Sequence, residues 1–158
     1  EATLEATKCL LNCAASNSNA QTTCRASDMI PQTHSDAACL VATQARSRAG
    51  GYHYLVSHDN NQFNAHILVV SKVIKHVMGS AAKAKAAATH LNAQEAIPIR
   101  QALEEMGHPQ PKTPVIVDNT STQGLMTKTM TPKRSKRYDM RTNCLKYRGA
   151  QKQFDLIW

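Results

Sequence analysis

The sequence contains few aromatic residues and no long apolar run. Aromatic residues make up 4% of the 158 positions and hydrophobic residues 42%, so a core must be built mainly from Ala, Val, Ile and Leu. No apolar run approaches the roughly 20 residues that a bilayer crossing needs, and residues 1–30 lack the basic start and apolar block of a secretory signal. The length suggests one domain. Because the first residue is Glu1, we expect the chain to be part of a longer protein.

The cysteines and histidines show no metal or disulfide pattern. Five cysteines occur without a C-x-x-C pair, which favours neither a disulfide framework nor a zinc knuckle. Free thiols suit a reducing compartment, the cytoplasm or the nucleus. Cys9 and Cys13 lie four residues apart, and we expect both to be small buried apolar side chains. The histidines are scattered singly, so a histidine metal site is not indicated.

The net charge of +8 is concentrated in the last quarter of the chain. One acid, Asp139, stands there among nine basic residues: Lys128, Lys133, Arg134, Lys136, Arg137, Arg141, Lys146, Arg148 and Lys152. The rest of the chain is neutral. Such a block predicts a contact with the phosphates of nucleic acid. A solvated helix face is the alternative interpretation.

The apolar pattern predicts nine helical and extended segments. Extended segments are expected at residues 29–39, 52–57, 65–74, 114–118 and 154–158. Helices are expected at residues 3–16, 80–107, 119–126 and 135–150. Ser80 can cap the long helix and Gly107 can end it, whereas Pro98 should kink or split it near residues 94–96. Gly50 and Gly51 are expected to open the second strand.

This order of segments predicts a mixed α/β fold. Three consecutive strands suit an antiparallel meander, and later strands separated by helices suit parallel additions to the same sheet. Two aspartates, Asp36 and Asp118, are each expected to end an apolar strand. Carboxylates at neighbouring strand tips can hold Mg²⁺, and two such ions can activate a water against a phosphodiester. An aspartate in that position is also a common turn or cap residue.

Six short stretches, in the same order, resemble the ribonuclease H domain at the C-terminus of copia-type retroelement polyproteins. They read HSDAACL, ARSRAGGYHYL, GSAAKAKAAA with NAQEAIPIRQALEEMGHPQP, TPVIVDNTSTQG, KRSKRYDMR and QKQFDLIW. The resemblance implies a ribonuclease H-like mixed sheet flanked by helices. It also implies that residues 27–158 form a C-terminally truncated domain, preceded by a helical segment at residues 1–26.

Members of that family bind two Mg²⁺ ions, or Mn²⁺, and hydrolyse the RNA strand of an RNA–DNA hybrid beside a reverse transcriptase portion. The resemblance places Asp36 and Asp118 at two of the metal-binding acids and Lys85 at the position of the catalytic glutamate. The last acid would lie beyond Trp158. Asp139 falls in a motif resembling the family's Asp-Met-Arg signature, where we expect it to organise the helix or position the backbone rather than bind metal.

The lysine predicts a catalytically impaired site. At about 4 Å and an effective dielectric constant near 20, each pair of unit charges is worth roughly 4 kcal/mol. Exchanging a carboxylate for an ammonium beside a dication therefore changes the energy by an amount on the order of 10 kcal/mol. The alternative function is a non-catalytic, basic nucleic-acid-binding or assembly module on the same fold. A remnant without present function is a third possibility.

Basic residues in two stretches are candidate nucleic-acid contacts, because guanidinium forks suit phosphate. They are Arg46, Arg48, Lys133, Arg134, Lys136, Arg137 and Arg141. The first two could instead be surface arginines beside a turn. The run at residues 133–137 could also be a nuclear-import-like patch.

Overall fold

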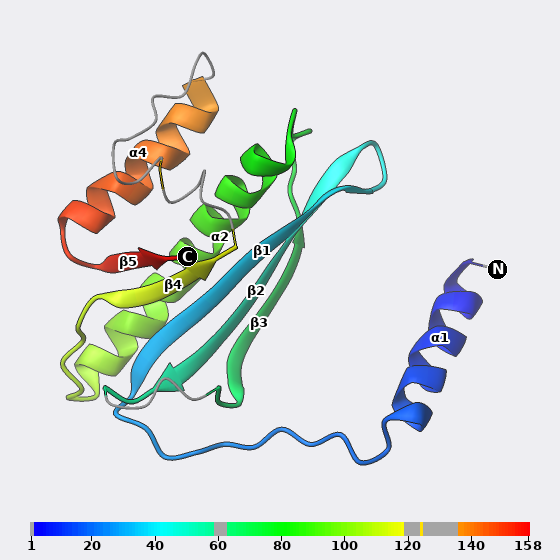
Figure 1. Ribbon diagram of the computed structural model, residues 1–158, viewed down its shortest axis with the longest axis horizontal. Coiled ribbons are helices and arrows are strands. Elements are labelled where there is room, and N and C mark those ends of the chain that lie inside the picture. The colour runs from blue at the N-terminus through cyan, green and yellow to red at the C-terminus, as the bar shows by residue number, and fades with distance from the viewer. Residues whose placement is uncertain (1, 59–62, 119–123, 125–135) are drawn as a thin grey trace.

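The computed structural model describes residues 2–58, 63–118, 124 and 136–158 (Figure 1). The elements in chain order are α1 (Ala2–Ser16), β1 (Ile30–Ala42), β2 (Arg46–Val56), β3 (His66–Val73), α2 (Ala81–Glu105), β4 (Thr113–Val117), α4 (Lys136–Ala150) and β5 (Phe154–Ile157). The short helix expected at residues 119–126 lies, but for Gly124, outside the described residues.

The five strands form one sheet in the order β3-β2-β1-β4-β5. β1 pairs antiparallel with β2 and β2 antiparallel with β3, whereas β1–β4 and β4–β5 are parallel. The predicted mixed sheet, an antiparallel meander extended by parallel strands, is therefore confirmed.

Two strand boundaries were predicted wrongly. β1 continues to Ala42, so Asp36 lies inside the strand opposite Gly50 rather than at its end. β2 begins at Arg46, which places the glycine pair in the strand interior. The hairpin turns at Gln44 and Ala45, which have φ angles of 60° and 51°. Alanine and glycine have a low intrinsic preference for strands. The Ala and Gly residues of β1 and β2 are therefore extended because they pair with each other across the hairpin.

Helix α2 packs its small side chains across one face of the sheet. Ala84, Ala87 and Ala88 are buried against Ala37 and Ala49 of the hairpin strands. Because these side chains are short, the helix can lie close to the strands. Ser80 caps the helix as predicted, with its side chain accepting a hydrogen bond from the backbone N–H of Lys83.

Helix α2 approaches the sheet closely at Gly51. A Cβ atom there would lie 2.0 Å from Oδ1 of Asn92, so only glycine leaves room for that amide. The fully buried Asn92 donates hydrogen bonds of 2.8 Å to the Ser35 hydroxyl and to the Gly50 carbonyl. A polar contact thus fastens the middle of the helix to β1 and β2.

Of the predicted kink or split at Pro98, the split is wrong, because α2 runs unbroken from Ala81 to Glu105, and the kink stays a prediction. Proline removes the N–H that would bond the carbonyl of Gln94. Both Pro98 and Gln94 are exposed, so water can satisfy that carbonyl. The buried neighbours Ala93 and Ala96 hold the helix against Val115 and Phe154.

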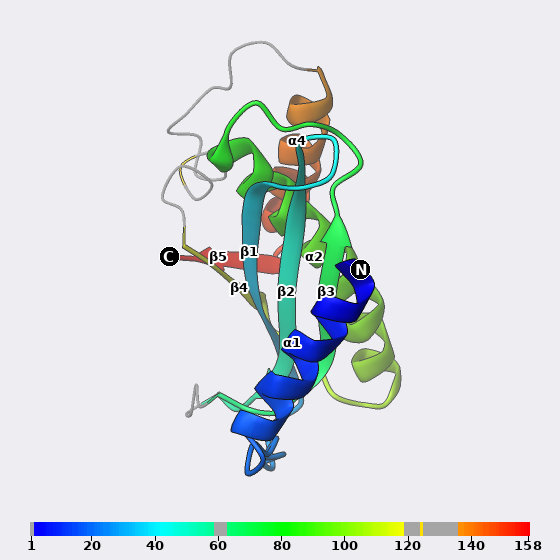
Figure 2. The same ribbon diagram turned by 90° about the vertical axis from the view of Figure 1, so that its right-hand side faces the viewer.

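Helices α2 and α4 lie together on one side of the sheet, and α1 lies on the other (Figures 1 and 2). Residues 3–16 of α1 are all exposed. The expected burial of Cys9 and Cys13 is therefore wrong, because α1 packs on no part of the sheet. Within the described residues, no helix has the length and apolar character needed to cross a membrane.

Candidate nuclease site and its lysine

The site is a charged cluster in which one ammonium group contacts two carboxylates. Nζ of Lys85 lies 3.4 Å from Oδ1 of Asp36 and donates a hydrogen bond to Oδ2 of Asp118. The lysine side chain is 24% exposed, whereas those of Asp36 and Asp118 are 69% and 60% exposed. We refer to these three residues as the Lys85 cluster.

The sheet register and the start of α2 bring these residues together. Ser35 pairs with Val117 in the parallel β1–β4 ladder, so Asp36 and Asp118 follow at the same level on neighbouring strands. Asp118 comes directly after β4. Lys85 lies in the second turn of α2, and the helix begins at this same end of the sheet.

The carboxylates keep the lysine protonated. The hydrogen bond to Asp118 raises the pKa of Lys85 above its usual value, desolvation opposes this, and the charge of Asp36 raises it further. The backbone N–H of Ala37 also donates to Oδ1 of Asp36 at 2.6 Å. The arrangement is therefore an ion pair shared by two acids.

These residues do not fit a two-metal centre. A divalent cation needs several oxygen ligands, but the space between Asp36 and Asp118 is taken by the Lys85 ammonium. Among the described residues, no group of three His, Cys, Asp or Glu side chains could hold a metal ion. The ammonium group of Lys85 therefore occupies the position between the two acids where Mg²⁺ or Mn²⁺ was expected.

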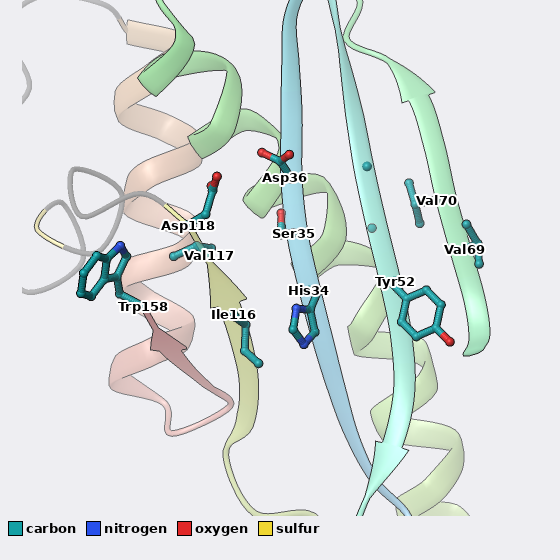
Figure 3. A pocket seen from close by; sticks show the side chains of 12 residues that line it. His34, Ser35, Asp36, Tyr52, Val69, Val70, Ile116, Val117, Asp118 and Trp158 are labelled. Carbon is teal, nitrogen blue, oxygen red and sulfur yellow. The ribbon is translucent and has the colours of Figure 1, made fainter. Parts of the chain in front are cut away.

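A hollow of about 640 Å³ adjoins the Lys85 cluster on the sheet face turned away from α2 (Figure 3). It is lined by His34, Ser35, Asp36, Gly50, Gly51, Tyr52, Val69, Val70, Ile116, Val117, Asp118 and Trp158. Burial lowers the pKa of His34, whose Nε2 lies 2.9 Å from the Tyr54 hydroxyl. Sequence reasoning missed this hollow, although the two-residue period of β1 and β2 would have placed His34, Asp36 and Tyr52 on one face.

The three predicted nucleic-acid contacts whose side chains are described, Arg46, Arg48 and Arg141, do not lie on one surface. Arg48 lies on the same sheet face as Asp36, because it pairs with Ala38, two residues after Asp36 in β1. Its Nη1 donates a hydrogen bond to the Ser71 hydroxyl at 3.3 Å. Arg46, at the hairpin, hydrogen-bonds the side chain of Gln44. Arg141 is half-buried in α4, on the opposite side of the sheet.

The remaining predicted contacts cannot be placed. Lys133 and Arg134 lie outside the described residues, and Lys136, Arg137 and Asp139 belong to the first turn of α4, where the side chains are not described.

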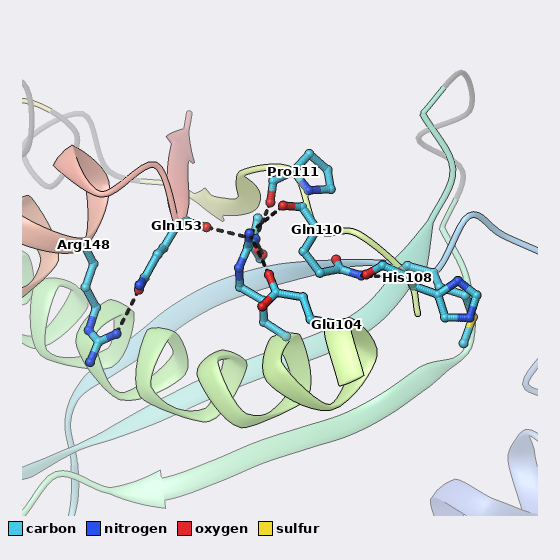
Figure 4. A network of polar contacts seen from close by, with 9 residues as sticks. Glu104, His108, Gln110, Pro111, Arg148 and Gln153 are labelled. Carbon is cyan, nitrogen blue, oxygen red and sulfur yellow. Dashed lines mark hydrogen bonds and ion pairs between the residues drawn. The ribbon is translucent and has the colours of Figure 1, made fainter. Parts of the chain in front are cut away.

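Sequence reasoning also missed Arg100, near the C-terminal end of α2. Its side chain is 12% exposed, and its guanidinium pairs with Glu104 at 3.3 Å. It donates to groups flanking β4 and β5 (Figure 4), namely the carbonyls of Gln110, Pro111 and Gln153 and the hydroxyl of Thr113. Arg100 therefore ties the helix to both parallel strands.

The fold is that of ribonuclease H. The chain superposes on the N-terminal RNase H domain of a Mycobacterium tuberculosis protein, solved as a fusion with maltose-binding protein, with a TM-score of 0.53 and 10% identity, covering 82% of this chain and 86% of that one. It matches LC11-RNase H1, isolated from compost by a metagenomic approach, with a TM-score of 0.58 and 10% identity over 80% and 81% of the two chains.

A second structure of LC11-RNase H1, in complex with an RNA/DNA hybrid, gives a TM-score of 0.51 and 12% identity over 80% of this chain and 84% of that one. No model of a protein family matches the sequence, and no curated protein does. The likeness to these solved structures therefore concerns the fold.

Proposed function

We propose that the chain is the ribonuclease H-like domain of a copia-type retroelement polyprotein. In this proposal residues 27–158 form the domain, residues 1–26 precede it, and a reverse transcriptase portion adjoins it. Its ligand is an RNA–DNA hybrid, and its metal-dependent hydrolysis of the RNA strand is lost or strongly weakened.

The observation that carries the proposal is the contact of the Lys85 ammonium with both Asp36 and Asp118. At about 4 Å and an effective dielectric constant near 20, an ammonium repels a dication by about 8 kcal/mol. Rotation of the lysine into solvent would lessen this repulsion, but it would leave a site with two carboxylates. An RNA–DNA hybrid could therefore occupy the fold without the ions that its hydrolysis requires.

A cleavage assay tests the loss of activity. The full chain is incubated with a hybrid labelled on its RNA strand, with Mg²⁺ or Mn²⁺ and, as a control, with a chelator. We expect no more cleavage with metal than with chelator. Rapid metal-dependent turnover would refute the role given to Lys85.

Metal titration of Lys85→Glu tests the same point without relying on activity. Because the substitution replaces the ammonium by a third carboxylate, we expect Mn²⁺ to bind much more tightly than to the unmodified chain, as measured by calorimetry. Lys83→Glu is the matched control, since Lys83 lies on the same helix and forms no ion pair among the described residues. Equal gains in both variants would show a general charge effect and contradict the local explanation.

The second candidate is a non-catalytic nucleic-acid-binding or assembly module. The concentration of basic charge in the last quarter of the chain favours it. Hybrid binding should then weaken steeply as salt is raised, because lysines and arginines release counterions from the backbone. Arg141→Ala, within the basic last quarter, should lower the affinity, whereas Lys8→Ala, in the separate helix α1, should not. Absence of binding at low salt would exclude nucleic acid as the partner and leave assembly.

A further inference from the structure

The sheet face turned away from α2 and α4, here called the open face, carries apolar side chains that no other described part of the chain covers. Val69 and Val73 of β3 are 54% and 38% exposed, and Ile157 of β5 and Trp158 are 39% and 69% exposed. Val69 and Trp158 line the hollow beside the Lys85 cluster. A sheet face that stays in water is normally polar, so this one is built to be covered.

Helix α1 also exposes apolar side chains to solvent. Its only charged residues are Glu5 and Lys8, which share one side with Asn12. The rest of its circumference carries Ala, Leu and Cys side chains, with Thr3 and Thr7 among the leucines. Leu4, Leu10 and Leu11 are each more than half exposed. An isolated helix of 15 residues is only marginally stable in water, so α1 also needs a surface against which to pack.

The tether holds α1 on the side of the open face. Figures 1 and 2 show α1 across the sheet from α2 and α4. The chain is fastened to the start of β3 by hydrogen bonds from the Ala65 N–H to the Thr23 carbonyl at 3.1 Å and between Asn64 and the backbone of Arg25. Residues 17–22 remain free of the sheet and can span about 20 Å.

The dimensions of the two surfaces agree. Fifteen helical residues are about 22 Å long, and the eight residues of β3 extend over about 26 Å. A tether this short keeps the helix at a local concentration on the order of millimolar. The open face is thus exposed continuously to the apolar side of α1 in the same chain.

We propose that α1 folds back onto the open face of its own chain, with its leucines over the hollow and against Trp158. This gives the open face an intramolecular partner and places a cover beside the Lys85 cluster. The proposal does not depend on the nuclease ancestry of the site.

Fluorescence of Trp158, the only tryptophan, tests the proposal in the full chain. We expect Leu11→Asp to move the emission to longer wavelength and to increase quenching by acrylamide, because a charged residue on the apolar side opposes docking. Asn12→Asp is the matched control, since it adds the same carboxylate to the polar side, and it should leave both quantities unchanged. Identical spectra for the unmodified chain and Leu11→Asp, with Trp158 fully accessible in each, would overturn the proposal.

A disulfide test locates the helix directly. The five cysteines are first replaced by serine, and Ala14→Cys is then combined with a second new cysteine. In one variant this is Val69→Cys, on the open face. In the control it is Lys72→Cys, on the other face, where the native Lys72 contacts Glu95 of α2. Oxidised glutathione should cross-link the first pair within one chain and leave the second pair unlinked. A cross-link between two chains, or equal linking of both pairs, would overturn intramolecular docking.

Discussion

The two ends of α2 each present a cation to the sheet, but the partners differ in kind. Lys85 contacts the carboxylates of Asp36 and Asp118, whereas Arg100 donates chiefly to backbone carbonyls. Carbonyl oxygens carry no net charge and need donors when they are buried. Arg100 therefore supplies what the fold requires at that point. Lys85 neutralises two acids that the fold does not need.

Exposure separates the two ends as well. The Arg100 side chain is 12% exposed, and most of its partners are part-buried groups close to the starts of β4 and β5. The acids beside Lys85 are mostly exposed. Buried hydrogen bonds to a charged group are worth more than exposed ion pairs. The comparison predicts that the Arg100 end determines stability and that the Lys85 end determines chemistry.

The largest expected effect comes from Arg100→Ala. The part-buried guanidinium loses its hydrogen bonds to Gln110, Thr113 and Gln153 at once, so we expect a loss of about 3 kcal/mol in the free energy of unfolding, measured by urea denaturation. Lys112→Ala, which removes an exposed cation nearby, should change it by less than about 0.5 kcal/mol. Equal effects of the two substitutions would contradict the structural role of Arg100.

A smaller loss of stability is expected from Gly51→Ala. The substitution places a Cβ atom of β2 against the amide of Asn92, midway along α2. Such overpacking costs roughly 2 kcal/mol. Gly79→Ala is the control, because a Cβ there meets nothing within 4 Å. In an Asn92→Ala background, where the amide is gone, Gly51→Ala should cost much less than in the unmodified chain; an equal cost in both would show that the contact is not the cause.

The sheet topology could be predicted because its strands and helices have distinct patterns. β-branched runs such as that of β3, and the cap Ser80, are local signals. The interior of the β1–β2 hairpin is rich in Ala and Gly, and its extension depends on pairing between distant residues. The exposed surroundings of Pro98 likewise depend on how the helix packs.

The site could be predicted only in part, and by resemblance. The sequence singled out Asp36, Asp118 and Lys85, and the structure brings them into contact, while their catalytic or metal-binding role stays a prediction. Arg100 and the hollow carried no motif. Arg100 acts where α2 meets the starts of β4 and β5, and the hollow forms where β1, β2, β3 and β4 lie side by side. No single segment encodes either arrangement.

Acid should weaken the packing of α4 on α2 through His90. Desolvation, with smaller contributions from Arg141 and Arg148, lowers the pKa of His90. The folded state thus keeps it neutral, while the unfolded state takes up a proton below about pH 6.5. Stability should be complete above that pH and decline as the pH falls toward the lowered value. His90→Gln should flatten this part of the profile, and an unchanged profile would refute the assignment.

The smallest expected effect is that of Lys85→Met, which leaves Asp36 and Asp118 to repel each other. Because both acids are mostly exposed, we expect a loss of about 1 kcal/mol or less in the free energy of unfolding. The difference should shrink at high salt, which screens exposed charges, and adding Asp118→Asn should restore most of it in a double-mutant cycle. A loss as large as that of Arg100→Ala, insensitive to salt, would make the Lys85 cluster a structural contact and remove the distinction between the two ends of α2.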